Sequence, residues 1–218
     1  MKEHGMIFNG EMVRAILDGR KTQTRRPIKW KQTRFTEIGE REDGSKWPWN
    51  EDAEHACDFW HPCPFGAVGD RIWVRETFTG HYLDDDQIQD IKDGRDKASS
   101  LCEYRADYPD GYQAADGWTP SIHMPRWASR ILLEITDVRV ERLNAISEED
   151  AEAEGIDMEA LYDSQDCYDC IADHNMTGRP TVTGAFKYLW ESIYGEEGWK
   201  SNPWVWVIEF KRVEGGEA

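Results

Sequence analysis

The sequence predicts a protein of the α+β class, a small mixed β-barrel with flanking helices and three acidic or irregular insertions. Strand-like segments lie at both ends of the chain, and single helices or loops separate the strands between them, which disfavours regular β-α-β winding. The 218 residues include 11 Trp, 8 Tyr and 7 Phe, too many aromatics for a disordered chain and enough to bury a core. We therefore expect one domain over residues 1–218.

The first elements follow from the residues before Gly19. Ile7 and Phe8 indicate a short strand. Asn9 is a residue type that caps helices, and one apolar stripe predicts a helix near 10–18 that Gly19 ends. Residues 19–27 are then a polar loop or a short strand that ends at a proline.

The middle of the chain alternates strands with the three insertions, which we place at about 36–62, 79–120 and 161–182. Residues 71–78 predict a strand between the first two insertions, and residues 129–142 predict the longest strand, with a bend near its middle.

Three helix signals complete the pattern. A weak helix is expected near 86–91, and Ser147 caps a short helix that ends at Gly155. Thr183 is expected to cap the clearest helix, which Gly195 ends and whose apolar stripe consists of Phe186, Leu189, Trp190 and Ile193. The closing strand, 204–212, is expected to place on one face the side chains of Trp204, Trp206, Ile208 and Phe210.

The formal net charge of −17 is unevenly spread, because residues 1–34 hold nine bases against three acids. The acidic remainder repels phosphate, so we expect no binding to long duplex DNA. The basic segment can still receive a nucleoside or a short RNA. The alternative is that these bases form only a solvated face.

The compartment and the membrane relation follow from other features of the sequence. No apolar run is long enough to cross a bilayer, and the N-terminus opens no signal peptide. Five cysteines are an odd number without the spacing of a disulfide framework. We expect a reduced, cytoplasmic protein with no membrane partner.

Lys21 and Thr24 lie three residues apart in the basic loop, which we define as residues 19–26. A threonine hydroxyl becomes a nucleophile when a base takes its proton, and a lysine whose pKa is lowered by Arg20, Arg25 and Arg26 can be that base. On spacing alone, the favoured alternative is that the cations contact phosphate while Thr24 pairs in a strand.

The basic loop, Gly19-Arg20-Lys21-Thr22-Gln23-Thr24-Arg25-Arg26, resembles the G-x-K-x-x-x-x-R signature of the ASCH family, which has the PUA-like superfold. Later features agree in order, namely Gly69-Asp70 before Ile72-Trp73-Val74, the strand 131–140, Ile146-Ser147 with Glu154-Gly155, and the closing Trp206-Val207-Ile208-Glu209-Phe210. The similarity spans the whole chain, interrupted by the insertions, and residues 121–127 resemble the longer ASCH proteins of phages and prophages.

The resemblance implies binding of RNA or a modified nucleoside, and it implies an activity. Small bacterial members hydrolyse the amide of N4-acetylcytidine with a lysine, a threonine and a glutamate. Lys21 and Thr24 match the first two, and Glu154 matches the glutamate, with Glu152 as the alternative. The implied roles are nucleophile for Thr24, base for Lys21 and support for Glu154, without a cofactor. The alternatives are a non-catalytic module that binds RNA or a modified base, and a phage accessory protein that binds a host protein.

Further candidates surround this set. Arg20, Arg25 and Arg26 are expected to bind substrate. Glu76 lines the pocket or, as the favoured alternative, forms a structural ion pair. Arg126 and Trp127 clamp a base, or else Trp127 packs in the core while Arg126 extends to solvent.

Two half-sites for zinc appear in the insertions, although neither has a familiar finger spacing. We expect no metal and keep as the alternative a structural zinc bound by Cys57, His61, Cys63, Cys167, Cys170 and His174.

Overall fold

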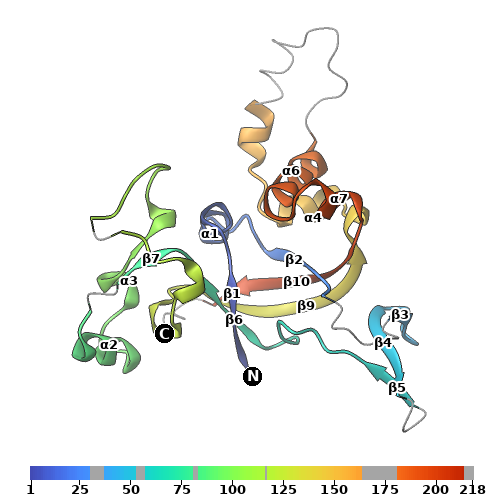
Figure 1. The fold of residues 1–218 in the computed structure, drawn as a ribbon, viewed down its shortest axis with the longest axis horizontal. Coiled ribbons are helices and arrows are strands. Elements are labelled where there is room, and N and C mark those ends of the chain that lie inside the picture. The colour runs from blue at the N-terminus through green and yellow to red at the C-terminus, as the bar shows by residue number, and fades with distance from the viewer. Residues whose placement is uncertain (30–36, 53–56, 81–82, 116, 164–180, 214–218) are drawn as a thin grey trace. The chain divides into compact units, whose positions relative to one another are not determined.

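The computed structural model describes residues 1–29, 37–52, 57–80, 83–115, 117–163 and 181–213 (Figure 1). Its largest sheet is five-stranded and mixed, with the order β1-β6-β9-β10-β2. These strands are β1 (Glu3–Ile7), β6 (Arg71–Arg75), β9 (Leu132–Arg142), β10 (Trp204–Arg212) and β2 (Gln23–Pro27). The α+β class is thus confirmed. In the described strands the order runs from β1 to β2, without the closure that a barrel requires.

The chain divides into two compact units, which we describe separately. Unit 1 comprises residues 1–18, 64–136 and 210–218, and unit 2 comprises residues 19–63 and 137–209. None of the helices described has the length and apolar content needed to cross a membrane.

Unit 1 is built on the parallel pairing of β1 with β6, from Glu3 opposite Arg71 to Ile7 opposite Arg75. Helix α1 (Gly10–Leu17) follows β1, and its N-cap Asn9 accepts a hydrogen bond from the Met12 N–H at 2.8 Å. Of the predicted apolar stripe, Met12, Val13 and Ile16 are buried and Leu17 is half-buried, and Ala15 is buried as well. This confirms the helix expected near 10–18.

The second insertion forms structure of its own within unit 1. It contains α2 (Asp85–Lys92), where we expected a weak helix, α3 (Ala98–Leu101), and the short strands β7 (Phe78–Thr79) and β8 (Glu103–Tyr104). A small core holds these pieces together and consists of Phe78, Cys102, Tyr104, Met124 and Ala128. The strand predicted at 71–78 is therefore two strands, β6 and β7, interrupted at Glu76 and Thr77.

Unit 2 packs helices against β10. The helices are α4 (Glu148–Ala153), α6 (Val182–Tyr194) and α7 (Glu196–Lys200). Ser147 caps α4 as predicted, by accepting from the Asp150 N–H. The cap of α6 is Thr181 and not Thr183, because the Thr181 hydroxyl accepts from the Gly184 N–H at 3.0 Å. Of the predicted stripe, Phe186 and Trp190 are buried, whereas Ile193 is 43% exposed.

Both faces of strand β10 are buried. Val205 and Val207 pack in a cluster with Phe186 and Trp190 of α6, while Trp206 and Ile208, which alternate with them, are buried as well. The strand pairs antiparallel with β2, from Val205 opposite Pro27 to Glu209 opposite Gln23. A strand buried on both faces has a nearly continuous apolar sequence, as residues 204–208 do.

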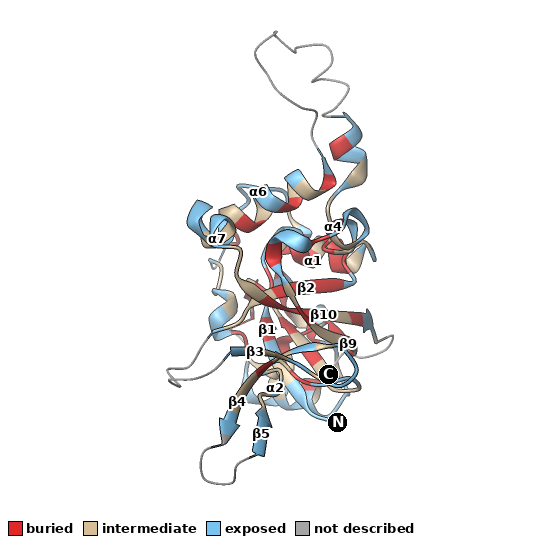
Figure 2. Cartoon of the chain, turned by 90° about the vertical axis from the view of Figure 1, so that its right-hand side faces the viewer, coloured by how far each residue is buried: buried red, intermediate tan, exposed pale blue. Residues whose placement is uncertain are grey.

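The first insertion, expected to be irregular, forms a three-stranded antiparallel sheet. Its strands are β3 (Glu37–Glu40), β4 (Lys46–Asp52) and β5 (Cys57–Trp60). Trp47 packs edge-on against Trp206 at 5.0 Å between ring centroids. Figure 2 shows exposed residues on β4 and β5, whereas buried residues follow the strands of the large sheet. Because charged residues interrupt the apolar pattern of this segment, its composition concealed the strands.

Candidate active site

The basic loop closes the C-terminal end of α4 within unit 2. Gly19 has φ of +79°, a backbone conformation that suits glycine, and it turns the chain out of α1. Lys21 then forms an isolated antiparallel bridge with Glu154. The Thr22 N–H donates to the Ala153 carbonyl at 2.9 Å, and Arg20 donates to the Gly155 carbonyl at 3.0 Å. N–H donors at the C-terminal end of a helix pair with its last carbonyls, and cations there interact favourably with the helix dipole.

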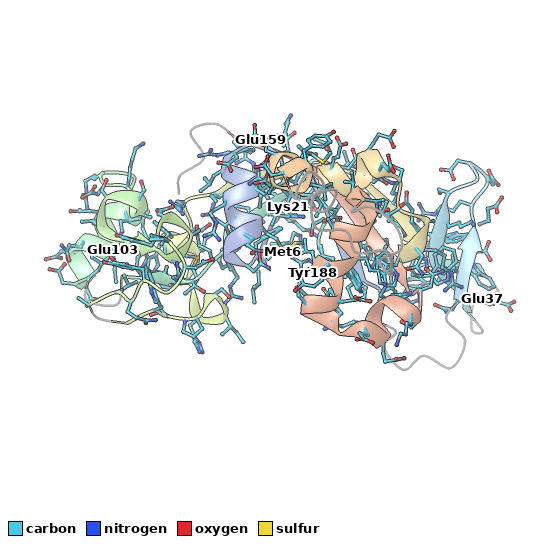
Figure 3. All side chains as sticks on the ribbon, turned by 90° about the horizontal axis from the view of Figure 1, so that it is seen from above. Met6, Lys21, Glu37, Glu103, Glu159 and Tyr188 are labelled. Atoms are coloured by element: carbon cyan, nitrogen blue, oxygen red, sulfur yellow. The ribbon has the colours of Figure 1, made fainter. Side chains whose placement is uncertain are left out.

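Lys21 and Glu154 are in direct contact although they lie far apart in the sequence. Lys21 Nζ donates to Glu154 Oε2 at 2.7 Å and to the Glu154 backbone carbonyl at 2.8 Å. Their side chains are 0% and 2% exposed (Figure 3 labels Lys21). Burial lowers the pKa of Lys21, Arg26 and Arg25 lower it further, and Glu154 partly opposes the shift. Glu152, the alternative glutamate, is exposed.

Arg25 gives the two oxygens of Glu154 different partners. Its Nη1 donates to Glu154 Oε1 at 3.2 Å, so that Oε2 remains with Lys21. Its Nη2 donates to Asp150 Oδ2 at 2.7 Å and to Glu141 Oε2 at 3.2 Å. The Arg25 side chain has no exposed surface, so contact with a substrate requires that one of these carboxylates be displaced.

A second layer of charges encloses this group, and sequence reasoning missed it. Arg139 Nη2 donates to Asp150 Oδ1 at 3.0 Å, its Nε donates to Glu141 at 2.6 Å, and its Nη1 contacts Glu209. Burial raises the pKa of Asp150, but Arg25 and Arg139 outweigh that effect and hold the pKa below its ordinary value. The available signal was the charged side chain of Arg139 within the apolar pattern of β9.

Thr24 lies on β2 opposite Ile208 and is 1% exposed. Gln23 and Arg25, its neighbours, both direct their side chains to Asp150. Since successive residues of a strand point to opposite faces, Thr24 points to the other face of β2. Among the described residues, its hydroxyl makes no hydrogen bond with Lys21 or Glu154. Arg26, which follows on β2, is half-buried opposite Trp206.

The other candidates belong to unit 1. Arg130 holds the two Glu76 carboxylate oxygens at 3.0 Å each and also binds Asp107, so Glu76 is in the ion pair that we favoured. Arg126 Nε donates to Glu3 at 2.8 Å, and Trp127 packs partly buried against the core around Phe78. Their proposed contact with a base remains a prediction.

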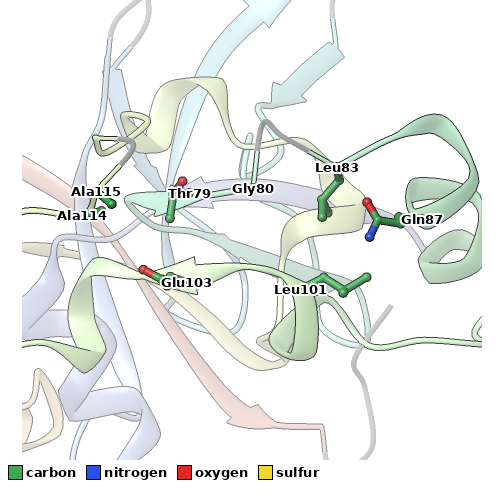
Figure 4. Close-up of a pocket in the computed structure, with 8 residues that line it drawn as sticks. All are labelled: Thr79, Gly80, Leu83, Gln87, Leu101, Glu103, Ala114 and Ala115. Carbon is green, nitrogen blue, oxygen red and sulfur yellow. The ribbon is translucent and has the colours of Figure 1, made fainter.

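A cavity of about 270 Å³ opens in unit 1 (Figure 4) and contains none of the predicted site residues. It is lined by Thr79, Gly80, Leu83, Gln87, Leu101, Glu103, Ala114 and Ala115.

Half of the candidate zinc ligands lie outside the described residues. Cys57 and Cys63 are not in a disulfide, and within the described ranges no group of three ligating side chains could hold a metal ion. Cys167, Cys170 and His174 lie in residues that the structure does not describe.

No protein-family model, curated protein or solved structure matches the chain.

Proposed function

We propose that this chain is an ASCH-family protein of the PUA-like superfold that binds a modified nucleoside, in isolation or in a short RNA, and hydrolyses its N4-acyl amide. The observation that carries the proposal is the buried contact between Lys21 and Glu154. The ASCH resemblance assigns both residues to one site. In the structure their side chains are in contact, although 133 residues separate them in the sequence. The acidic charge of the protein favours a single nucleoside over long duplex DNA.

Lys21 is well placed to act as the base. A neutral lysine has two N–H groups and one lone pair, and both N–H groups can be given to the carbonyl and carboxylate of Glu154. The lone pair is then free to accept a proton. The lowered pKa of Lys21 favours this neutral form.

The proposed reaction has two steps. Thr24 Oγ1 bonds to the acyl carbon as its proton passes to Lys21, and the bond from that carbon to N4 breaks as Lys21 returns the proton to the leaving amine. Water then hydrolyses the threonine ester to give the carboxylic acid and the free threonine. Arg25 is a positioning residue in this scheme, because it occupies Glu154 Oε1 and keeps Oε2 directed at Lys21.

The orientation of Thr24 favours a second candidate function. Thr24 points away from the face of β2 that carries Gln23 and Arg25, and a nucleophile must reach its base. A module that binds a modified base or RNA without turnover needs no such contact. The two candidates predict the same ligand and differ in whether product forms.

Hydrolysis of N4-acetylcytidine, followed as cytidine release, tests the proposal. Wild-type protein releases cytidine, and Thr24→Val and Lys21→Ala each remove the activity while circular dichroism shows a folded chain. Thr24→Val keeps the side-chain volume, and Thr24→Ser, which retains a hydroxyl, keeps activity. The control Lys29→Ala, an exposed base near the same loop, remains active. The effects of substituting residues that act as a unit do not add. The double variant of Thr24 and Lys21 is therefore expected to have the same activity as either single variant.

The outcomes separate the two candidates. Wild-type protein that binds N4-acetylcytidine and releases no cytidine refutes the enzyme and supports the binding module. Wild-type protein that neither binds nor hydrolyses N4-acylated nucleosides and short RNA refutes both.

A further inference from the structure

Two arginines of unit 1 converge on one exposed carboxylate oxygen. Arg14 lies on α1, and Arg105 begins a short 3₁₀ turn, Arg105–Asp107. Arg14 Nη2 and Arg105 Nη2 lie 3.8 and 3.6 Å from the same atom, Asp110 Oδ1. Each guanidinium is oriented by its other nitrogen, since Arg14 Nη1 donates to the Ala106 carbonyl and Arg105 Nη1 donates to the Tyr108 carbonyl. The two donors are therefore held in place independently of Asp110.

Asp110 interacts only weakly with these two arginines. Its side chain is 85% exposed. Both distances exceed the roughly 2.7–2.9 Å of a charge-assisted hydrogen bond, so neither arginine has a close anionic partner in Asp110. An exposed ion pair of this kind contributes about 0–1 kcal/mol, so little free energy is lost when Asp110 moves aside.

Asp110 lies in a turn over residues 109–112, and this turn carries a stack of aromatic rings. The Tyr112 N–H donates to the Pro109 carbonyl, and Gly111 has φ of +85°, which reverses the chain at Asp110. The rings of Tyr108 and Tyr112 are thereby stacked, with centroids 4.3 Å apart and planes within 9°. Trp118, six residues further along the chain, stabilises the turn by donating from Nε1 to the Tyr112 carbonyl. Tyr112 remains 40% exposed.

We propose that this turn binds a nucleoside 5′-monophosphate, with the phosphate in place of the Asp110 carboxylate and the base stacked on Tyr112. Arg14 and Arg105 together match a dianionic phosphate better than they match one carboxylate. Base stacking on an aromatic ring contributes about 1–3 kcal/mol and tolerates any base. This site uses none of the residues of the proposed active site.

The neighbouring acids limit the ligand to a small one. Asp107 is engaged by Arg130 through two hydrogen bonds, so it does not compete for Arg14 or Arg105. Glu103 is exposed and interacts with Tyr108. A single nucleotide carries few charges, whereas a long polyanion meets net repulsion from a chain of formal net charge −17.

Titration with AMP, followed by calorimetry, tests the site. Adenine stacks strongly and is not the base of the proposed hydrolysis, so failure here is independent of the active site. Arg105→Ala weakens binding about tenfold or more, as loss of one charge-assisted contact of roughly 1.4 kcal/mol or more implies. Tyr112→Ala weakens it by a similar factor, and Tyr112→Phe, which keeps the ring, restores it.

The variant Asp110→Asn tests the site most directly. It removes the carboxylate that competes with the phosphate, so it is expected to tighten AMP binding several-fold. Asp86→Asn, an exposed acid in α2, makes the same charge change elsewhere in unit 1 and is expected to leave binding unchanged. Equal effects of the two variants, or no AMP binding by wild type and Asp110→Asn, overturn the site. Inorganic phosphate or adenosine that binds as tightly as AMP overturns the joint recognition of phosphate and base.

Discussion

Replacing Glu154 by glutamine is expected to destabilise the protein strongly, and more than Lys21→Met does. The substitution keeps the shape of the side chain and removes its charge, which leaves Lys21 and Arg25 without the carboxylate between them. Lys21 and Arg25 have no exposed side-chain surface, so water cannot replace the lost partner. Glu154→Gln also leaves the backbone bond from Lys21 Nζ to the Glu154 carbonyl in place.

The magnitude follows from this burial. Breaking a buried ion pair by removing one partner costs about 3–5 kcal/mol. We expect the low end, about 3 kcal/mol, because Arg25 keeps Asp150 and Glu141 and because Lys21 can lose its proton. For a chain of this size, about 3 kcal/mol lowers the melting temperature by roughly 6–12 °C.

Lys21→Met is the matched control. It leaves Glu154 with Arg25 as a partner, so its cost is smaller than that of Glu154→Gln, about 1–2 kcal/mol. Urea unfolding at neutral pH, followed by tryptophan fluorescence, measures both variants and their combination. The double variant closes a cycle whose coupling energy is expected to exceed about 1 kcal/mol. A Glu154→Gln variant within about 1 kcal/mol of wild type would refute the reasoning.

The pH dependence supplies a second measurement on the same pair. Because the pKa of Lys21 is lowered in the folded protein, the unfolded chain binds more protons between that pKa and the ordinary value of 10.5. Its contribution to stability therefore increases as pH rises through this window. Lys21→Met abolishes the contribution, so the difference in unfolding free energy between wild type and variant grows in favour of wild type toward alkaline pH. A difference that is constant or falls with pH contradicts the lowered pKa.

Three further outcomes are expected. Glu76→Gln leaves Arg130 with Asp107 as its carboxylate partner, so we expect it to cost about 1–3 kcal/mol in urea unfolding and to leave N4-acetylcytidine hydrolysis unchanged. Loss of hydrolysis with full stability would instead place Glu76 in the active site. Phe186→Ala empties a position that is 2% exposed in the core of unit 2 and costs about 3–5 kcal/mol, whereas the exposed Tyr188→Ala on the same helix stays within about 0.5 kcal/mol of wild type. Metal analysis of protein purified without added metal finds less than one equivalent of zinc; one equivalent that is lost together with folding in Cys170→Ser contradicts our expectation.

Local signals in the sequence predicted the elements whose ends are set by neighbouring residues. Asn9 and Ser147 each cap their helix through a side chain that reaches the N–H group three residues on, and this geometry depends only on the local chain. Thr181 and Thr183 are the same residue type two positions apart. Only the position of the Gly184 N–H decides between them, which is why the cap of α6 was misplaced.

Contacts between distant segments were harder to predict. The ASCH resemblance, and not any periodicity, placed Glu154 with Lys21. Arg25 was expected to bind substrate because the charge count of the basic loop does not include the carboxylates of Glu141 and Asp150, which β9 and α4 bring to it. The sheet β3-β4-β5 was missed for a related reason, since Trp47 packs on Trp206, a residue near the other end of the chain.

The pairing of β2 with β10 constrains when the protein can fold. Lys21 and Glu154 are separated by 133 residues, and Gln23 of β2 meets Glu209 near the end of the chain. At about 5–20 residues per second, a ribosome needs roughly 10–40 s to reach β10 after it has made β2. Glu141, Asp150 and Glu154 are made before β10, but until β10 is made β2 has no strand partner and remains an unpaired edge. Nascent chains of this protein are therefore expected to depend on protection of β2, and truncation before β10 leaves Thr24 and Arg25 on a strand without its partner.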